Sequence, residues 1–87
     1  MNGMSLCDIP LGKKSIVVKV ISTGSIKRRL LDIGLTPGTI VESVFSNPGG
    51  NLTAYMIRGA LIAVRDSDSR NILVREIESW SYLKIIL

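Results

Sequence analysis

The sequence contains no histidine among its 87 residues. Histidine is the most frequent general base and metal ligand in proteins, because its imidazole changes charge near neutral pH. Without it, the two histidines and one carboxylate that hold ferrous iron in many enzymes cannot be assembled. We therefore expect no catalytic residue, no metal-binding residue, no resident cofactor and no enzymatic activity.

Cysteine is almost as scarce, since Cys7 is the only one. One cysteine cannot form a disulfide within the chain, and no leader with a charged start and an apolar middle opens the sequence, which predicts a cytoplasmic protein. Cys7 has neither a CxxC partner nor a basic neighbour in the sequence. We expect a small, buried or half-buried side chain without thiol chemistry.

Long apolar runs are also missing, because none approaches the about 20 residues that a membrane-spanning helix needs. Any contact with a membrane is therefore expected to be indirect, through a partner protein. The net charge of +4 permits an acidic partner, a membrane surface or nucleic acid, and does not select among them.

What the sequence does contain is enough apolar residues for one core, with a hydrophobic fraction of 46%. A chain of this length builds a single domain. We expect residues 1–78 to form this domain and residues 79–87 to be an apolar C-terminal extension. An entry loop before the first strand is predicted to place two or three apolar side chains on the core, from Leu6, Ile9 and Leu11.

Alternation of apolar and polar residues predicts five strands. In the first, residues 15–21, the period of two puts Ile16, Val18 and Val20 on one face and Lys19 on the other. The other strands are expected at residues 39–45, 52–57, 61–64 and 72–74. The breaks between the later strands are predicted to be a hairpin loop, a tight reversal and one turn of 3₁₀ helix, at residues 46–51, 58–59 and 66–71.

The period changes to that of a helix over residues 26–33, where Ile26, Leu30 and Ile33 make one apolar stripe. This predicts a short helix after the first strand, with Ser25 as its N-cap. About two and a half turns are marginal in isolation, so packing must stabilise the helix.

The end of this helix carries stop and turn signals. Gly34 stands where a left-handed C′ residue is wanted, and Pro37 prevents the helix from continuing. The sequence Thr36-Pro37-Gly38-Thr39 matches a type II turn, in which Gly38 supplies the positive φ. Gly34, Pro37 and Gly38 are therefore assigned a structural role.

Five short strands cannot cover their own apolar face as a flat sheet, whereas a strongly bent sheet can. The predicted fold is mostly β, a small SH3-like five-stranded barrel with one short α-helix after the first strand. A parallel α/β sheet is excluded, because it needs a crossover helix between each pair of strands.

The densest basic cluster of the chain lies on the predicted helix, at Lys27, Arg28 and Arg29. Leu31 falls off the apolar stripe and is expected to lean outward between the cations. Such a face is usually only solvated, and the alternative is a protein-docking surface. Nucleic-acid binding is disfavoured, because no aromatic residue clusters with the cations as a stacking platform. The docking surface would comprise Lys27, Arg28, Arg29, Leu30 and Leu31.

The extension at residues 79–87 is apolar to its last residue, although chain ends are usually polar. It either adds a strand to the same barrel or pairs with a neighbouring chain to make a homodimer. The residues assigned to possible self-association are Trp80, Tyr82, Leu83 and Ile85.

The run from Ile26 to Gly38, IKRRLLDIGLTPG, resembles the basic, leucine-rich helix followed by G-[apolar]-x-P-G that marks the FeoA family. The resemblance covers residues 9–77, and the chain departs from the family pattern from Ser79 onward. It implies an SH3-like domain that acts as a small cytoplasmic accessory protein of bacterial ferrous-iron uptake.

The partner that this resemblance implies is FeoB, a membrane permease with an N-terminal GTP-binding domain. The chain would be recruited to the inner face of the cell membrane, dock on the permease through the helix surface and modulate transport. An arginine finger in trans, supplied by Arg28 or Arg29, is the less favoured variant of this mechanism. Two alternatives stay open: an SH3-like module that binds nucleic acid, and a regulatory module similar to the C-terminal domain of iron-dependent repressors.

Overall fold

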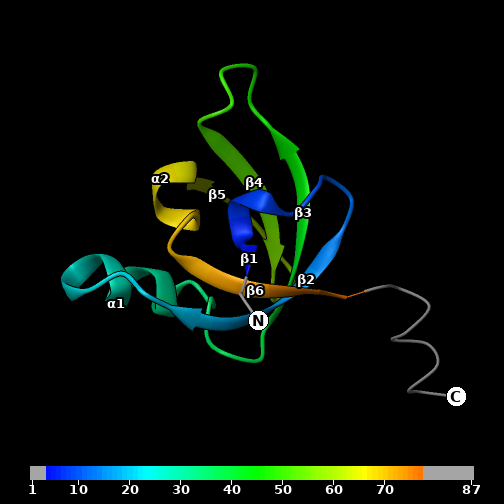
Figure 1. The fold of residues 1–87 in the computed structure, drawn as a ribbon. Helices are drawn as coiled ribbons and strands as arrows, with labels where there is room; N and C mark the ends of the chain where they lie inside the picture. Colours follow the sequence, from blue (N-terminus) through cyan, green and yellow to red (C-terminus); the bar gives the residue numbers. More distant parts are fainter. Residues whose placement is uncertain (1–3, 78–87) are drawn as a thin grey trace, which may run out of the picture.

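The computed structural model describes residues 4–77 of the chain. One antiparallel sheet of six strands, in the order β1-β6-β2-β3-β4-β5, bends around the core, and short helices lie beside it (Figure 1). The strands are β1 (Met4–Ser5), β2 (Lys14–Val20), β3 (Ile40–Ser46), β4 (Leu52–Ile57), β5 (Ala60–Arg65) and β6 (Ile72–Ile77). The helices are the 3₁₀ helix η1 (Leu6–Asp8), α1 (Gly24–Asp32) and α2 (Asp66–Ser69).

The mostly-β class is confirmed, whereas the closed, five-stranded barrel is wrong. The additional strand, β1, is a two-residue segment in which Met4 pairs with Val74 and Ser5 with Leu73. Within residues 4–77, the sheet ends at β1 on one side and at β5 on the other, and these edges do not pair. Fully buried side chains from two connections, Leu6 and Leu35, help to cover the inner face, so the core does not require closure.

The inner face of β2 is the opposite of the predicted one. Ser15 and Val17 are buried, whereas Val18 is 46% exposed. A shift of register between Val17 and Lys19 against β6 then returns Val20 to the core. A β-bulge therefore reverses the alternation within one strand, which a strict period of two cannot represent.

Helix α1 starts earlier than predicted, with Thr23 rather than Ser25 at the N-cap position. Its C-terminus agrees with the prediction: the Leu35 N–H bonds to the Leu30 carbonyl and the Gly34 N–H to the Leu31 carbonyl. This pair of hydrogen bonds is a Schellman motif, and Gly34 has the positive φ of 111° that the motif requires.

The predicted turns are present. The Thr39 N–H bonds to the Thr36 carbonyl, and Gly38 has φ of 92°, as a type II turn requires. A two-residue loop, Arg58-Gly59, joins β4 to β5, so that Ile57 pairs with Ala60. The segment predicted as a 3₁₀ turn forms instead the single α-helical turn of α2.

The bent sheet wraps around the core, to which α1 contributes Leu30. Leu6 and Ile9 are buried and Leu11 is 53% exposed, in agreement with two or three core side chains from the entry loop. The prediction that Cys7 is buried or half-buried is wrong, because Cys7 is exposed. Every strand except β1 contributes buried hydrophobic residues to the core, and the helices and connections add others: Leu6, Ile9, Val17, Val20, Leu30, Leu35, Val41, Tyr55, Ile57, Val64, Ile72 and Val74. None of the helices between residues 4 and 77 is long and apolar enough to span a membrane.

Candidate functional site

Helix α1 presents its basic side chains to solvent and Leu30 to the core, whereas Ile26 of the predicted apolar stripe is exposed. Lys27, Arg28 and Arg29 are exposed, as predicted. Leu30 is only 2% exposed, and Leu31 is half-buried and packs against the core, so the prediction that Leu31 leans outward is wrong. The exposed apolar residue among the cations is Ile26, at 42%. We call Ile26, Lys27, Arg28 and Arg29 the α1 surface.

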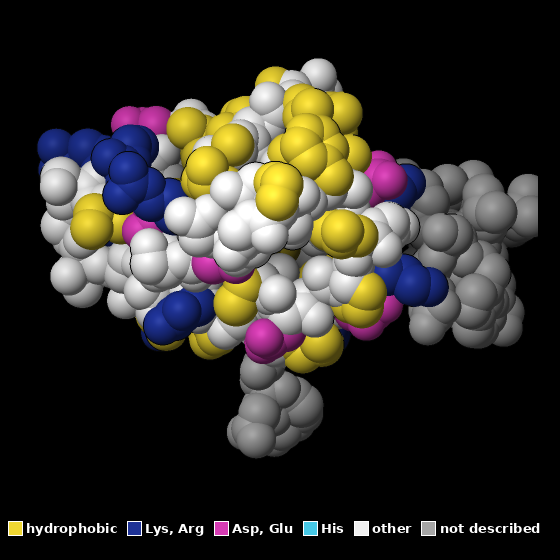
Figure 2. Space-filling model, turned by 90° about the horizontal axis from the view of Figure 1, so that it is seen from above, with side chains coloured by type: hydrophobic (Ala, Val, Ile, Leu, Met, Phe, Trp, Pro, Cys, Tyr) yellow, Lys and Arg dark blue, Asp and Glu magenta, His cyan; other side chains and the backbone are white. Residues whose placement is uncertain are grey.

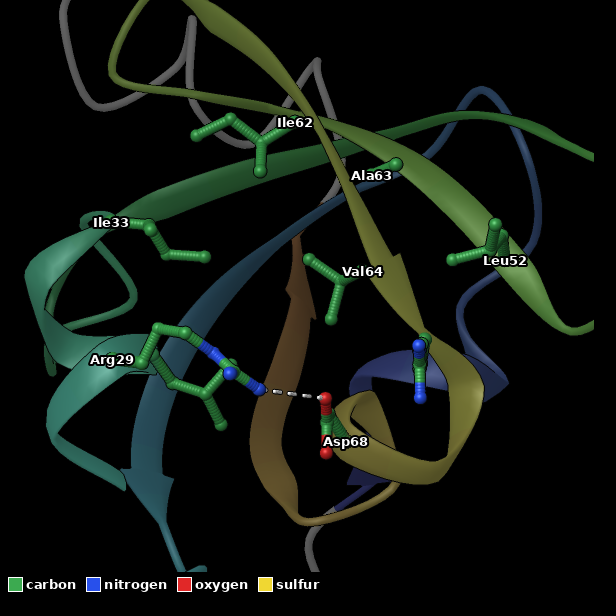
Figure 3. Close-up of a pocket in the computed structure, with 9 residues that line it drawn as sticks. Arg29, Ile33, Leu52, Ile62, Ala63, Val64 and Asp68 are labelled. Carbon is green, nitrogen blue, oxygen red and sulfur yellow. Dashed lines mark ion pairs between the residues drawn. The ribbon is translucent and has the colours of Figure 1, made fainter. Parts of the chain in front are cut away.

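A cleft of about 380 Å³ separates α1 from strand β5, with α2 at one end (Figure 3). Its walls combine apolar side chains of both elements with two arginines and one aspartate. The lining residues are Arg29, Leu30, Ile33, Leu52, Ile62, Ala63, Val64, Arg65 and Asp68. A volume of this size lies within the range of ligand-binding pockets.

The charges at the cleft are mainly positive. Arg29 points toward Asp68, and its Nη2 is 3.7 Å from Oδ2 of Asp68 (Figure 3). Because 67% of the Arg29 side chain is exposed, water screens this ion pair and it contributes little to stability. The second arginine, Arg65, ends β5. The cleft therefore offers two cations against one carboxylate.

A cluster of hydrogen bonds fixes the turn after α1 to the β4–β5 loop. Arg58 Nη2 donates to the Thr36 Oγ1 at 2.9 Å and to the Thr39 Oγ1 at 3.1 Å. Arg58 also has a positive φ of 49°, which the two-residue loop imposes. Gly34 lies against this arginine, because a Cβ there would be 3.0 Å from the Arg58 Cδ. We call Arg58, Thr36 and Thr39 the Arg58 clamp.

Exposed apolar side chains gather on the outer face of the sheet beside the cleft. Phe45, Met56 and Leu61 are all exposed, and they come from adjacent strands, since Met56 pairs with Leu61 and Phe45 with Ala54. Figure 2 shows hydrophobic side chains gathered on the sheet, beside the basic side chains that lie over α1. This juxtaposition is typical of a protein-binding surface.

Sequence reasoning found the basic helix and missed the cleft, the Arg58 clamp and the apolar face. Each of these joins residues far apart in the chain, such as Arg29 with Asp68 or Thr36 with Arg58. The one local signal was Arg58-Gly59, which indicated the tight reversal without its side-chain contacts. The proposed self-association residues Trp80, Tyr82, Leu83 and Ile85 lie outside the described residues.

Among residues 4–77, no three His, Cys, Asp or Glu side chains gather as a metal ion would require. Partial burial, and then the carboxylates of Asp8 and Asp66, raise the pKa of the Cys7 thiol, which disfavours the reactive thiolate at neutral pH. The arrangement favours a partner with apolar and acidic groups.

Comparisons with known proteins support the fold described above. The family model described as the FeoA domain matches residues 4–76. The chain is similar to a FeoA-like protein from Clostridium acetobutylicum, with 24% identity, a TM-score of 0.82, and coverage of 91% of this chain and 92% of that one.

A second similar structure is that of Stenotrophomonas maltophilia FeoA complexed with zinc. It is described as an SH3 domain protein and a candidate activating factor of ferrous-iron transport. The identity is 28% and the TM-score 0.73, over 82% of this chain and 88% of that one. The bent sheet of this chain is therefore SH3-like.

The fold also occurs within a manganese-dependent transcriptional repressor, at 13% identity and a TM-score of 0.79. The match covers 88% of this chain and 42% of the repressor. This likeness concerns the fold alone. A comparison with curated proteins found none that matches the chain.

Proposed function

The chain belongs to the FeoA family, and on that premise we propose that it is a non-catalytic accessory protein of bacterial ferrous-iron uptake. In this proposal it binds the cytoplasmic parts of a FeoB-type permease and modulates transport. The observation that carries the proposal is the match of the FeoA domain to residues 4–76. Among residues 4–77, a basic surface lies beside an apolar one. No three potential metal-binding side chains gather in this part of the chain.

The proposed contact is the α1 surface. Arg28 and Arg29 are exposed cations and Ile26 is an exposed apolar side chain, so together they supply charge and an apolar anchor. Leu30 and Leu31 hold the helix on the core and would support this surface from beneath. Electrostatic attraction would contribute to binding through this surface, so salt is expected to weaken the binding.

The place of action in this proposal is the cytoplasm, at the inner face of the cell membrane, where the permease recruits the chain. No membrane anchor of its own is invoked, and no nucleic acid is involved. Self-association through Trp80, Tyr82, Leu83 and Ile85 remains a proposal, separate from binding to the permease.

The function is tested by measuring uptake of radioactive ferrous iron in anaerobic cells that carry the permease and lack this chain. Expression of the wild-type chain is expected to restore uptake, whereas Arg28→Glu and Ile26→Asp, at equal protein level, restore less of it. Lys13→Glu makes the same charge change at an exposed residue outside α1 and is expected to restore uptake fully. Uptake that does not depend on the chain would overturn the proposal.

A further inference from the structure

Strand β5 is an open edge of the sheet. It pairs with β4 on one side, from Leu52–Arg65 to Ile57–Ala60, and is last in the strand order among residues 4–77. In an antiparallel pair, alternate residues direct their N–H and C=O groups away from the partner strand. With a two-residue loop, the residues of β5 that do so are Leu61, Ala63 and Arg65.

This edge lacks the features that normally prevent further pairing. Strand β5 has six residues, ALIAVR, with no proline or lysine, and its pairing with β4 continues without a bulge. The opposite edge, β1, is only two residues long. A long, regular and mostly apolar edge is the kind to which an extended peptide adds as a strand.

The cleft provides space and side-chain contacts along this same edge. Leu30 of α1 lines the cleft, and Ile33, directly after the helix, lies across it from Ile62 and Val64 of β5 (Figure 3). An added strand would lie about 4.8 Å from β5, on the side that α1 flanks. The apolar walls would accept alternate side chains of the added strand, while the main chain of β5 supplies hydrogen bonds.

The charges select the occupant. Arg29 and Arg65 line the cleft, whereas Asp68 is the one acidic lining residue. Both arginines lie at the α2 end of the cleft, because Arg65 ends β5 and Arg29 contacts Asp68 of α2. Carboxylates at that end of a bound segment would fix its register and disfavour basic segments. An occupant that is acidic at one end and apolar along the rest complements this distribution.

We propose that an extended segment of a partner protein, acidic at one end and apolar along the rest, adds as a strand to β5 inside the cleft between α1 and β5. The segment contributes main-chain hydrogen bonds to Leu61, Ala63 and Arg65, apolar side chains to the cleft walls and carboxylates to Arg29 and Arg65. This inference depends on the proposed function in one respect: both require that the partner is a protein.

The test uses a synthetic probe peptide of alternating valine and threonine residues with two glutamates at one end, labelled with fluorescein. Fluorescence anisotropy is expected to show saturable, micromolar binding to the full chain. A peptide of the same sequence, N-methylated at alternate residues, cannot make the main-chain ladder and is expected to bind on the order of tenfold more weakly. Equal binding of both peptides would contradict strand addition.

Two variants of the protein test whether the peptide binds at β5. Ala63→Pro removes an outward N–H and is tolerated at an edge position; we expect on the order of tenfold weaker binding, while Ala63→Val binds like the wild type. Arg65→Glu is expected to weaken binding at low salt, whereas Lys13→Glu does not. Circular dichroism checks that each variant is folded.

The remaining outcomes separate this inference from other occupants and from the proposed function. If the wild-type chain is a dimer that Ala63→Pro converts to a monomer, a second copy occupies β5 and the inference is wrong. Absence of probe binding would also overturn it. In both cases, binding to the full-length permease, measured independently, decides whether the proposed function stands.

Discussion

At the scale of the residue, Gly34 satisfies two constraints at once. Its φ of 111° lies in the region that favours glycine, and it packs against the neighbouring hairpin. A Cβ at this position would lie 2.9 Å from the Ile57 Cγ2 and 3.0 Å from the Arg58 Cδ. The backbone conformation and the close packing therefore both exclude a larger residue.

Gly34→Ala is expected to lower the free energy of unfolding by about 3 kcal/mol, because it combines backbone strain with overpacking. Gly38→Ala is the matched control: its φ is 92°, but no atom lies within 4 Å of the added Cβ. We expect about 1 kcal/mol from strain alone. Urea unfolding measures both losses, and equal values would show that the contacts of Gly34 do not matter.

Tyr55 is expected to make the free energy of unfolding decrease at alkaline pH. The residue is buried, and this burial raises the pKa of its phenol. The protonated phenol is the form that the fold favours, so its contribution is fully present below the unfolded pKa of about 10 and is lost as pH rises above it.

The prediction for Tyr55 is that the free energy of unfolding falls as pH rises above about 10, and that Tyr55→Phe falls less steeply over the same range. The phenylalanine keeps the ring in the core and has no proton to lose. Denaturant unfolding at a series of pH values provides the comparison. If the two proteins have the same pH slope, Tyr55 is not the group responsible.

At the scale of the element, packing rather than intrinsic propensity holds α1 in place. The helix has nine residues, no side-chain cap and one fully buried residue, Leu30. A helix of this length is marginal in isolation. Leu30 and the Arg58 clamp at the helix end are therefore the main attachments of the α1 surface to the sheet.

Leu30→Ala is expected to cost about 3 kcal/mol of stability, through lost burial and the cavity left behind. Ile26→Ala, on the same helix, removes an exposed side chain, and its effect is expected to stay within about 0.5 kcal/mol. Thermal and urea unfolding report both changes. A comparable loss in both variants would mean that Ile26 is not free for a partner.

The Arg58 clamp is tested by a double-mutant cycle. Arg58→Asn removes the guanidinium and keeps a residue that tolerates positive φ, so we expect a loss of about 1 kcal/mol. Thr36→Val removes one acceptor. If the contact is direct, the double variant loses less than the sum of the two single variants, whereas strictly additive losses would exclude the clamp.

The elements that could be predicted are those with local signals. The helix stop at Gly34, the turn at Pro37 and Gly38, and the Arg58-Gly59 reversal are each specified by adjacent residues. The buried face of β2 was predicted wrongly, because consecutive apolar residues leave the alternation ambiguous and the bulge has no local signature. Exposure of Cys7 and Leu11 likewise depends on how the entry segment pairs with β6.

The candidate site was predictable only in part, for the same reason. The cations of α1 were visible as a local cluster, but the apolar residue among them was misassigned: Ile26 is exposed and Leu31 packs inward. Which side of α1 packs inward is decided by its contacts with the core, which the spacing of apolar residues alone does not specify. The cleft and the open edge require knowledge of long-range pairing that no local pattern contains.

At the scale of the whole molecule, the bent sheet leaves one region with the features of a binding surface. The α1 surface carries positive charge, the adjoining sheet carries apolar side chains, and the cleft lies between α1 and β5 (Figures 2 and 3). The net charge of +4 favours association with an acidic partner at low salt. In the proposed function, a FeoB-type permease is that partner.

Docking of the α1 surface on the permease is tested most directly by the affinity of the purified chain for the full-length permease in lipid nanodiscs, measured by microscale thermophoresis. We expect saturable binding that Arg28→Glu and Ile26→Asp, both folded, weaken on the order of tenfold or more, while Lys13→Glu binds like the wild type. No binding by the wild-type chain, or the same Kd for all four proteins, would contradict it.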